Sequence, residues 1–363
     1  MTWKAAAFLT TTLALVAAAG AGAHSTRLRG VHGRLWVTER TLNTVTAYDA
    51  ATGSVLGTVP VGVSPIGVVE PRGTGKAYSA DEGSNQVTVI DAETVTFLKT
   101  IPVGPRPHHT YPSLDGRWVF FGELGQNTVG VIDTTTDERV TGCPASANPA
   151  ARTHAPWATH NGRYVFATNE VTNDIGVMAF NGTTCELLFN VPVGNRPSEI
   201  LVPEHDVVAY VSVRNENKVK EVDLLARKVT REVFVGEQPD TLQLLPHGHT
   251  LIVALRVAPP RITYIDTRSF TAETIPVGPG TITGHEWLSK NGRYTFVAVE
   301  NAPNGHVVVV DNRTRTVVAT YPYPAGTRPH GVHFAPREDG DDDDGEEERG
   351  DLKKGGSDGR RRN

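Results

Sequence analysis

The chain has 363 residues, a formal net charge of −5 and a hydrophobic fraction of 39%. Residues 338–363 alone hold 11 acidic and 6 basic side chains, a net of −5, so the rest of the chain is close to neutral. Nucleic-acid binding usually needs a clustered basic surface, and this charge balance disfavours it.

The first residues have the features of an export signal. Lys4 precedes an apolar run from Ala5 to Gly20, and Ala21-Gly22-Ala23 fits the small-residue pattern that signal peptidase accepts. The run is too short and too rich in alanine for a good membrane span. We therefore predict a signal peptide over residues 1–23, a secreted or periplasmic location, and no transmembrane segment in the mature protein.

One pattern recurs from Arg34 to Pro336, with a period near 43 residues, as in "VTVIDAETVTFLKTIPVGPRP". Its turn asparagines step by 42, 42, 46 and 44 residues, at Asn43, Asn85, Asn127, Asn173 and Asn217. Seven such units fit, each with about four short strands, which is typical of a β-propeller. The prediction is an all-β, seven-bladed propeller of four-stranded antiparallel blades over residues 24–337.

The ends of the repeat region predict how the ring closes. The segment after the second proline of each unit is the inner strand of the next blade. The repeats begin at Leu35 without an inner strand and end with Gly331 to Pro336, which has no blade of its own. We expect these two segments to pair. The tail 338–363 has almost no apolar residues, so we expect it to be disordered.

The repeats carry a family resemblance. "YVFATNEVTNDIGV", "VTVIDAETVTFLKTIPVGPRP" and "LSKNGRYTFVAVEN" resemble the YVTN family of β-propeller repeats, over roughly Arg34 to Pro336. The resemblance implies the fold but little chemistry, because propellers include binders, lyases, lactonases and electron-transfer enzymes. DNA binding is known among YVTN-type propellers, but the charge of this chain disfavours it.

Ionisable residues gather where the chain enters the predicted inner strands, at one mouth of the central channel. Neutral imidazole binds zinc, copper, iron or nickel, and a carboxylate can complete the shell or act as a general base. The candidate metal ligands are His108, His109, His154, His285 and His330; the candidate carboxylates are Glu199, Asp240 and Glu286. Turn residues His160, His205, His247 and His249 fall on the opposite side and are interpreted as surface residues.

The adjacent histidines raise a question of direction. Because successive residues of a strand face opposite ways, we expect one of His108 and His109 to enter the channel and the other either to pack outward or to donate a hydrogen bond from behind the ligands. A ring of inner-strand histidines is similar to the copper site of nitrous-oxide reductase, also a seven-bladed propeller, although here not every blade supplies a histidine. A merely solvated polar mouth is the alternative.

Two cysteines, Cys143 and Cys185, follow the third strands of consecutive units. Neighbouring blades would bring them together, and export permits a disulfide. The prediction is a bridge, with two unpaired thiols as the alternative.

Two classes of function stay open. The first is a secreted scaffold, expected to be monomeric, that binds a small ligand or a protein partner; the lack of any strong catalytic motif favours it. The second is an enzyme, a lyase, hydrolase or oxidoreductase, that depends on a transition-metal ion held by the channel histidines.

Overall fold

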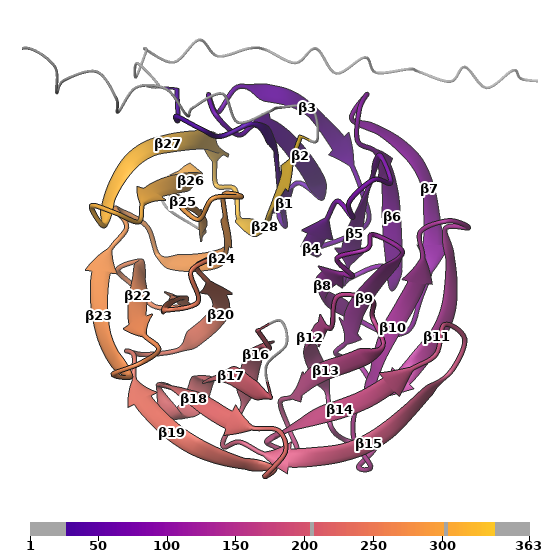
Figure 1. Cartoon of the computed structure of the whole chain (residues 1–363). Helices are drawn as coiled ribbons and strands as arrows, with labels where there is room; N and C mark the ends of the chain where they lie inside the picture. Colours follow the sequence, from indigo (N-terminus) through magenta and orange to yellow (C-terminus); the bar gives the residue numbers. More distant parts are fainter. Residues whose placement is uncertain (1–26, 204–206, 301–303, 338–363) are drawn as a thin grey trace, which may run out of the picture.

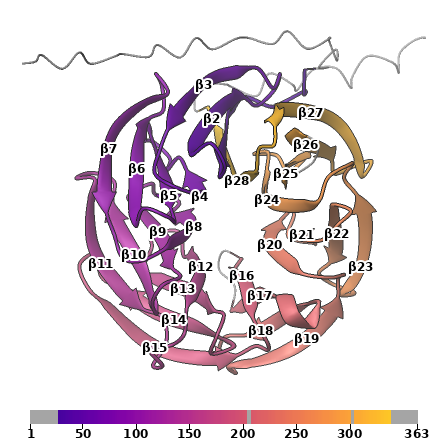
Figure 2. The ribbon, with the colours of Figure 1, turned by 180° about the vertical axis from the view of Figure 1, so that it is seen from behind.

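The computed structural model describes residues 27–203, 207–300 and 304–337. Seven four-stranded antiparallel sheets stand around a central channel as the blades of a propeller (Figure 1). The reverse view shows the same closed ring (Figure 2). The predicted fold is therefore confirmed. The proposed signal peptide and charged tail, residues 1–23 and 338–363, lie outside the described residues.

Each blade has the same strand order from the channel outward, so the strands are grouped by position. The inner strands are β28 (Pro329–Pro336), β4 (Pro65–Val69), β8 (Pro107–Pro112), β12 (Thr153–Ala158), β16 (Pro197–Leu201), β20 (Pro239–Leu244) and β24 (Ile282–Leu288). The second strands are β1 (Gly33–Glu39), β5 (Lys76–Asp81), β9 (Trp118–Glu123), β13 (Tyr164–Asn169), β17 (Val208–Val213), β21 (Thr250–Leu255) and β25 (Tyr294–Glu300).

The outer half of each blade completes the sheet. The third strands are β2 (Thr44–Asp49), β6 (Gln86–Asp91), β10 (Thr128–Asp133), β14 (Asp174–Phe180), β18 (Lys218–Asp223), β22 (Arg261–Asp266) and β26 (Asn304–Asp311). The outer strands are β3 (Val55–Pro60), β7 (Thr96–Pro102), β11 (Glu138–Pro144), β15 (Cys185–Pro192), β19 (Lys228–Phe234), β23 (Thr271–Pro276) and β27 (Thr316–Ala325).

Helix is nearly absent from the described ranges. They contain one short 3-10 segment, η1 (Arg214–Glu216), after β17. Within those ranges, no helix combines the length and the apolar character that a membrane span requires.

The hydrophobic core is divided into layers between neighbouring blades. One layer packs Trp36 and Val45 of the first blade against Val68 and Ile90 of the second. Burial of apolar surface stabilises by about 25 cal/mol per Å², and a single blade has no partner for its two faces. The closed ring gives every blade two such partners.

The turn asparagines hold the loops that lead into the inner strands. Asn43, Asn85, Asn173 and Asn217 adopt positive φ, which asparagine tolerates better than most residues. The side-chain oxygen of Asn85 accepts a hydrogen bond of 2.9 Å from the backbone N–H of Arg106, in the loop of the next blade. The repeated asparagine thus positions the mouth of the channel.

The ring closes between the two ends of the propeller. β28 pairs antiparallel with β1, from Gly33 opposite Pro336 to Val37 opposite Val332. The Thr38 hydroxyl accepts the Gly331 N–H at 2.8 Å and donates to the Ile66 carbonyl at 3.0 Å. The predicted closure is confirmed, and Thr38 ties the closing strand to the second blade.

One disulfide joins two blades. Cys143 in β11 bonds to Cys185 in β15, with the Cα atoms 5.0 Å apart, and neither cysteine is free. The predicted bridge is confirmed. It connects the third and fourth blades, which supply the inner strands β8 and β12.

Candidate functional site

Every inner strand has a register irregularity at its mouth end. The shift in β8 lies between Pro107 and Thr110, and the other six inner strands show one at the equivalent place. A β-bulge breaks the alternation of side chains and re-aims them. His108 and His109 therefore lie on the same side, with stacked rings, and the expectation that these two side chains face opposite ways is wrong.

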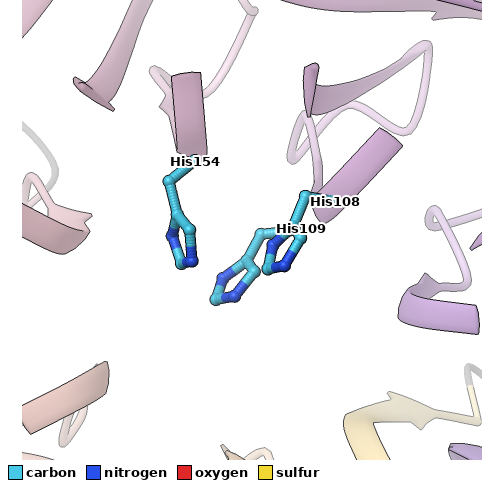
Figure 3. A group of neighbouring side chains, drawn as sticks. All are labelled: His108, His109 and His154. Carbon is cyan, nitrogen blue, oxygen red and sulfur yellow. The ribbon is translucent and has the colours of Figure 1, made fainter. Parts of the chain in front are cut away.

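His108 and His109 from β8 and His154 from β12 form a compact group, which we call the histidine triad (Figure 3). One ring nitrogen from each residue lies within 4.8 Å of the other two. The ring centroids are 4.8 Å apart for His108 and His109, and 4.4 Å apart for His109 and His154. Two neighbouring blades thus supply three imidazoles to one point.

Polar groups behind the triad fix two of its rings. His109 Nδ1 lies 2.8 Å from Glu199 Oε2, and His154 Nδ1 donates to the Ser198 carbonyl at 2.7 Å. Within the described part of the chain, the buried atoms His108 Nδ1 and His109 Nε2 have no hydrogen-bond partner. Each of these two imidazoles therefore keeps a ring nitrogen free.

Burial keeps the triad uncharged. It lowers the pKa of His109 to about 4 and holds the pKa values of His108 and His154 well below the usual range, where the neighbouring histidines add to the effect. At neutral pH all three imidazoles are neutral, and this is the form that binds metals.

The two other predicted histidines extend the group without joining its centre. The His285 ring lies 4.1 Å from that of His109 and 4.5 Å from that of His330, between centroids. His330 Nδ1 is 2.6 Å from Glu300 Oε1. The five candidates therefore form one continuous chain of contacts, and the nitrogens of three converge.

The three candidate carboxylates differ in environment. Burial raises the pKa values of Glu199 and Glu286 well above the usual range. Burial would raise the pKa of Asp240 as well, but the charges of Arg214 and Arg256 hold it well below its usual range. Asp240 is bonded to Arg214 and is a charge partner, whereas Glu199 and Glu286 face the channel interior.

A small cavity lies beside the triad. Its volume is about 30 Å³, and it is lined by His109, Glu199, Thr241, His285 and Glu286, among others. Three buried atoms of these residues have no hydrogen-bond partner among the described residues: His109 Nε2, His285 Nε2 and Glu286 Oε1. A cavity of this size and polarity suits one water molecule.

A family model described as "Lactonase, 7-bladed beta-propeller" matches residues 77–259. The chain belongs to this lactonase family. The match includes β8, β12, β16 and β20, so it covers most of the site. It establishes the propeller family, while the resemblance to YVTN repeats stays a prediction.

Solved structures share the fold of this lactonase-family chain. A functionally unknown protein from Desulfotomaculum acetoxidans has a TM-score of 0.71 and 11% identity, covering 84% of this chain and 99% of its own. A putative 6-phosphogluconolactonase from Bacteroides uniformis has a TM-score of 0.68 and 17% identity, covering 84% of this chain and 99% of its own. A periplasmic gluconolactonase from Pseudomonas aeruginosa has a TM-score of 0.67 and 18% identity, covering 83% of this chain and 98% of its own. No curated protein matches the chain.

Sequence reasoning missed the charged ring at the mouth of this lactonase-family propeller. Its arginines share a few carboxylates: Glu170, for example, lies near Arg152, Arg196 and Arg214. The members are Arg40, Arg106, Arg152, Arg196, Arg214, Arg256 and Arg328, with Glu82, Glu170, Asp240 and Glu300. The signal was present as an arginine that recurs directly before the inner strand, at Arg106, Arg152, Arg196 and Arg328.

Proposed function

We propose that the protein is an exported hydrolase that opens a cyclic ester, a lactone, with a water molecule held in the channel. The water-sized cavity carries this proposal, because three of its lining residues each have a buried polar atom without a partner among the described residues: His109 Nε2, His285 Nε2 and Glu286 Oε1. Unpaired buried polar groups are costly, so three of them in the lining of one small space favour a bound water with a chemical role.

The residues around the cavity suit the steps of ester hydrolysis. Burial lowers the pKa of His285 well below its usual range, so its neutral imidazole can accept a proton as the water oxygen attacks the lactone carbonyl. The ring C–O bond then breaks. Burial raises the pKa of Glu286, so its protonated carboxyl can donate to the departing oxygen. The product is an open-chain hydroxy acid.

Membership of the lactonase family supports this reaction class. Two proteins of similar fold are named as a putative 6-phosphogluconolactonase and a gluconolactonase, and the second is named as periplasmic. That location agrees with the export signal predicted at residues 1–23.

A binding scaffold is the second candidate, and two volumes favour it. The channel cavity of about 30 Å³ is far smaller than ligand pockets, which hold roughly 300–1,000 Å³. An open groove of about 1150 Å³ lies at the far end of the inner strands and is lined by Arg27, Arg29, Arg293 and Arg313. This groove suits an acidic ligand or partner.

An assay of lactone ring opening distinguishes the hydrolase from the binding scaffold. The purified protein is mixed with δ-gluconolactone or γ-butyrolactone, and acid release is followed at constant pH against the spontaneous rate. We expect catalysis by the native protein and a loss of about 10²- to 10⁴-fold in Glu286→Gln and His285→Ala. His249→Ala, at an exposed turn, serves as the control. A native protein that never exceeds the spontaneous rate would leave the scaffold function standing.

A further inference from the structure

We infer that His108, His109 and His154 bind one transition-metal ion, zinc or copper, at the centre of the channel. The convergence of the three rings is the first argument. Their nitrogens lie within 4.8 Å of one another, whereas a tetrahedral ion with bonds of about 2.0–2.1 Å needs nitrogens roughly 3.4 Å apart. Binding of the ion would therefore draw the three rings closer together by rotation of their side chains.

The unpaired nitrogens are the second argument. His108 Nδ1 and His109 Nε2 are buried and have no partner among the described residues, although an imidazole nitrogen in such a place is normally hydrogen-bonded. A cation between the rings would pair both of them. No side chain in the described ranges takes that role.

The groups behind the rings are the third argument. A metal-binding histidine usually binds the ion with one ring nitrogen and gives the other to a carboxylate or a backbone carbonyl. His109 meets Glu199 at 2.8 Å in this way, and His154 meets the Ser198 carbonyl at 2.7 Å. Both contacts come from β16, so the next blade orients the rings that the triad presents.

The donor set selects the kind of ion. Imidazole suits zinc and copper, while calcium and magnesium require oxygen ligands. No thiolate competes, because both cysteines of the chain form the disulfide. A carboxylate is also close: Glu170 Oε1 lies 3.8 Å from His154 Nε2. This carboxylate can balance part of the charge of a divalent ion.

The neighbouring cavity gives the ion a chemical role. Three protein ligands leave a coordination position open, and a zinc ion with such a position lowers the pKa of its bound water to about 7. His109 belongs both to the triad and to the cavity wall, so a bound water would face His285 and Glu286. This role rests on the proposed function, whereas the metal site itself does not.

Metal binding is tested on the whole protein, freed of metal by a chelator. Calorimetric titration with Zn²⁺, and separately with Cu²⁺, should show one ion per chain, and the stronger response identifies the preferred ion. His108→Ala and His154→Ala should each lose at least 100-fold in affinity. His247→Ala should bind as the native protein does. Co²⁺ titration adds a visible absorption band that reports the ligand geometry without any substrate.

Each outcome decides a separate point. Failure of the native protein to bind either ion overturns the site, whatever the variants do, so a variant that does not fold leaves the test intact. Equal affinity in His108→Ala, His154→Ala and the native protein places the ion elsewhere and also overturns it. Metal binding without lactone opening upholds the site and refutes the hydrolase. Lactone opening that survives complete metal removal refutes the role of the ion in catalysis.

Discussion

Two pairs of neighbouring histidines lie at opposite ends of the inner strands. In both pairs the rings approach each other, at 4.8 Å for His108 and His109 and at 5.6 Å for His247 and His249. The first pair has unpaired buried nitrogens. The second is exposed: His247 Nδ1 accepts the His249 N–H at 3.1 Å, and His249 Nε2 lies 2.7 Å from Arg268.

The comparison shows that two histidine pairs that look alike in the sequence differ in their surroundings. Both pairs are equally visible in the sequence. Of the two pairs, only the channel pair meets a third imidazole from the next blade and a carboxyl group behind it, and burial lowers the pKa values of both its members. The predictions below test this difference.

The largest expected effect is on catalysis. His109→Ala removes a triad member that also lines the cavity, so lactone opening should fall by about 10²- to 10⁴-fold. His249→Ala should keep the native rate, since its side chain meets Arg268 and the turn residue His247, far from the triad. Initial rates measured at constant pH check both variants. Equal losses would show that the two pairs do not differ as described.

The disulfide should have the largest effect on stability. It joins the two blades that supply the triad, and replacing both Cys143 and Cys185 by alanine should cost roughly 2 to 4 kcal/mol of unfolding free energy. Denaturant unfolding of the variant and the native protein measures the loss. An unchanged midpoint would mean that packing alone holds these blades together.

A smaller effect is expected from the group behind the triad. Glu199→Gln keeps the shape of the side chain but replaces the carboxyl group that faces His109 Nδ1 with an amide, so Zn²⁺ affinity should fall by about 10- to 100-fold. Glu216→Gln, in the half-buried segment η1 of the same blade, is a matched control, because its carboxylate contacts Lys220 and not the triad. Native-like zinc affinity in Glu199→Gln would show that the carboxylate does not support the ligand.

The smallest expected effect is on stability, and it compares a loop at the mouth of the channel with a turn at the other end of the inner strands. The loop into β8 is held by Asn85, so Asn85→Ala should lose about 1 kcal/mol for the bond to the Arg106 N–H, plus strain at φ 55°. His247→Ala removes only an exposed turn contact and should cost less. The thermal midpoints of the two variants provide the comparison, and an inverted order would refute it.

The repeat made the fold predictable, because Asn43, Asn85 and their equivalents mark the period directly. The closing strand and the disulfide followed from counting where units begin and end. The sequence did not predict the side to which the His108 and His109 side chains point. The alternation rule assumes a regular strand, and the bulge after Pro107 depends on pairing with β9. The charged ring, which includes Arg214, Asp240 and Arg256, was not predicted either. Its ion pairs join residues that are far apart in the chain, and a single sequence does not show which of them pair.

The closing strand also has a consequence for the order of folding. Gly331 and Thr38, which are bonded across the seam, are separated by 293 positions in the chain. A nascent chain therefore has its first blade without an inner strand, and the edge of β1 stays unpaired until the last strand is made. Contacts so distant in sequence form slowly. The channel is complete only after β28 has been made and has joined β1, so its contents must be acquired after that step.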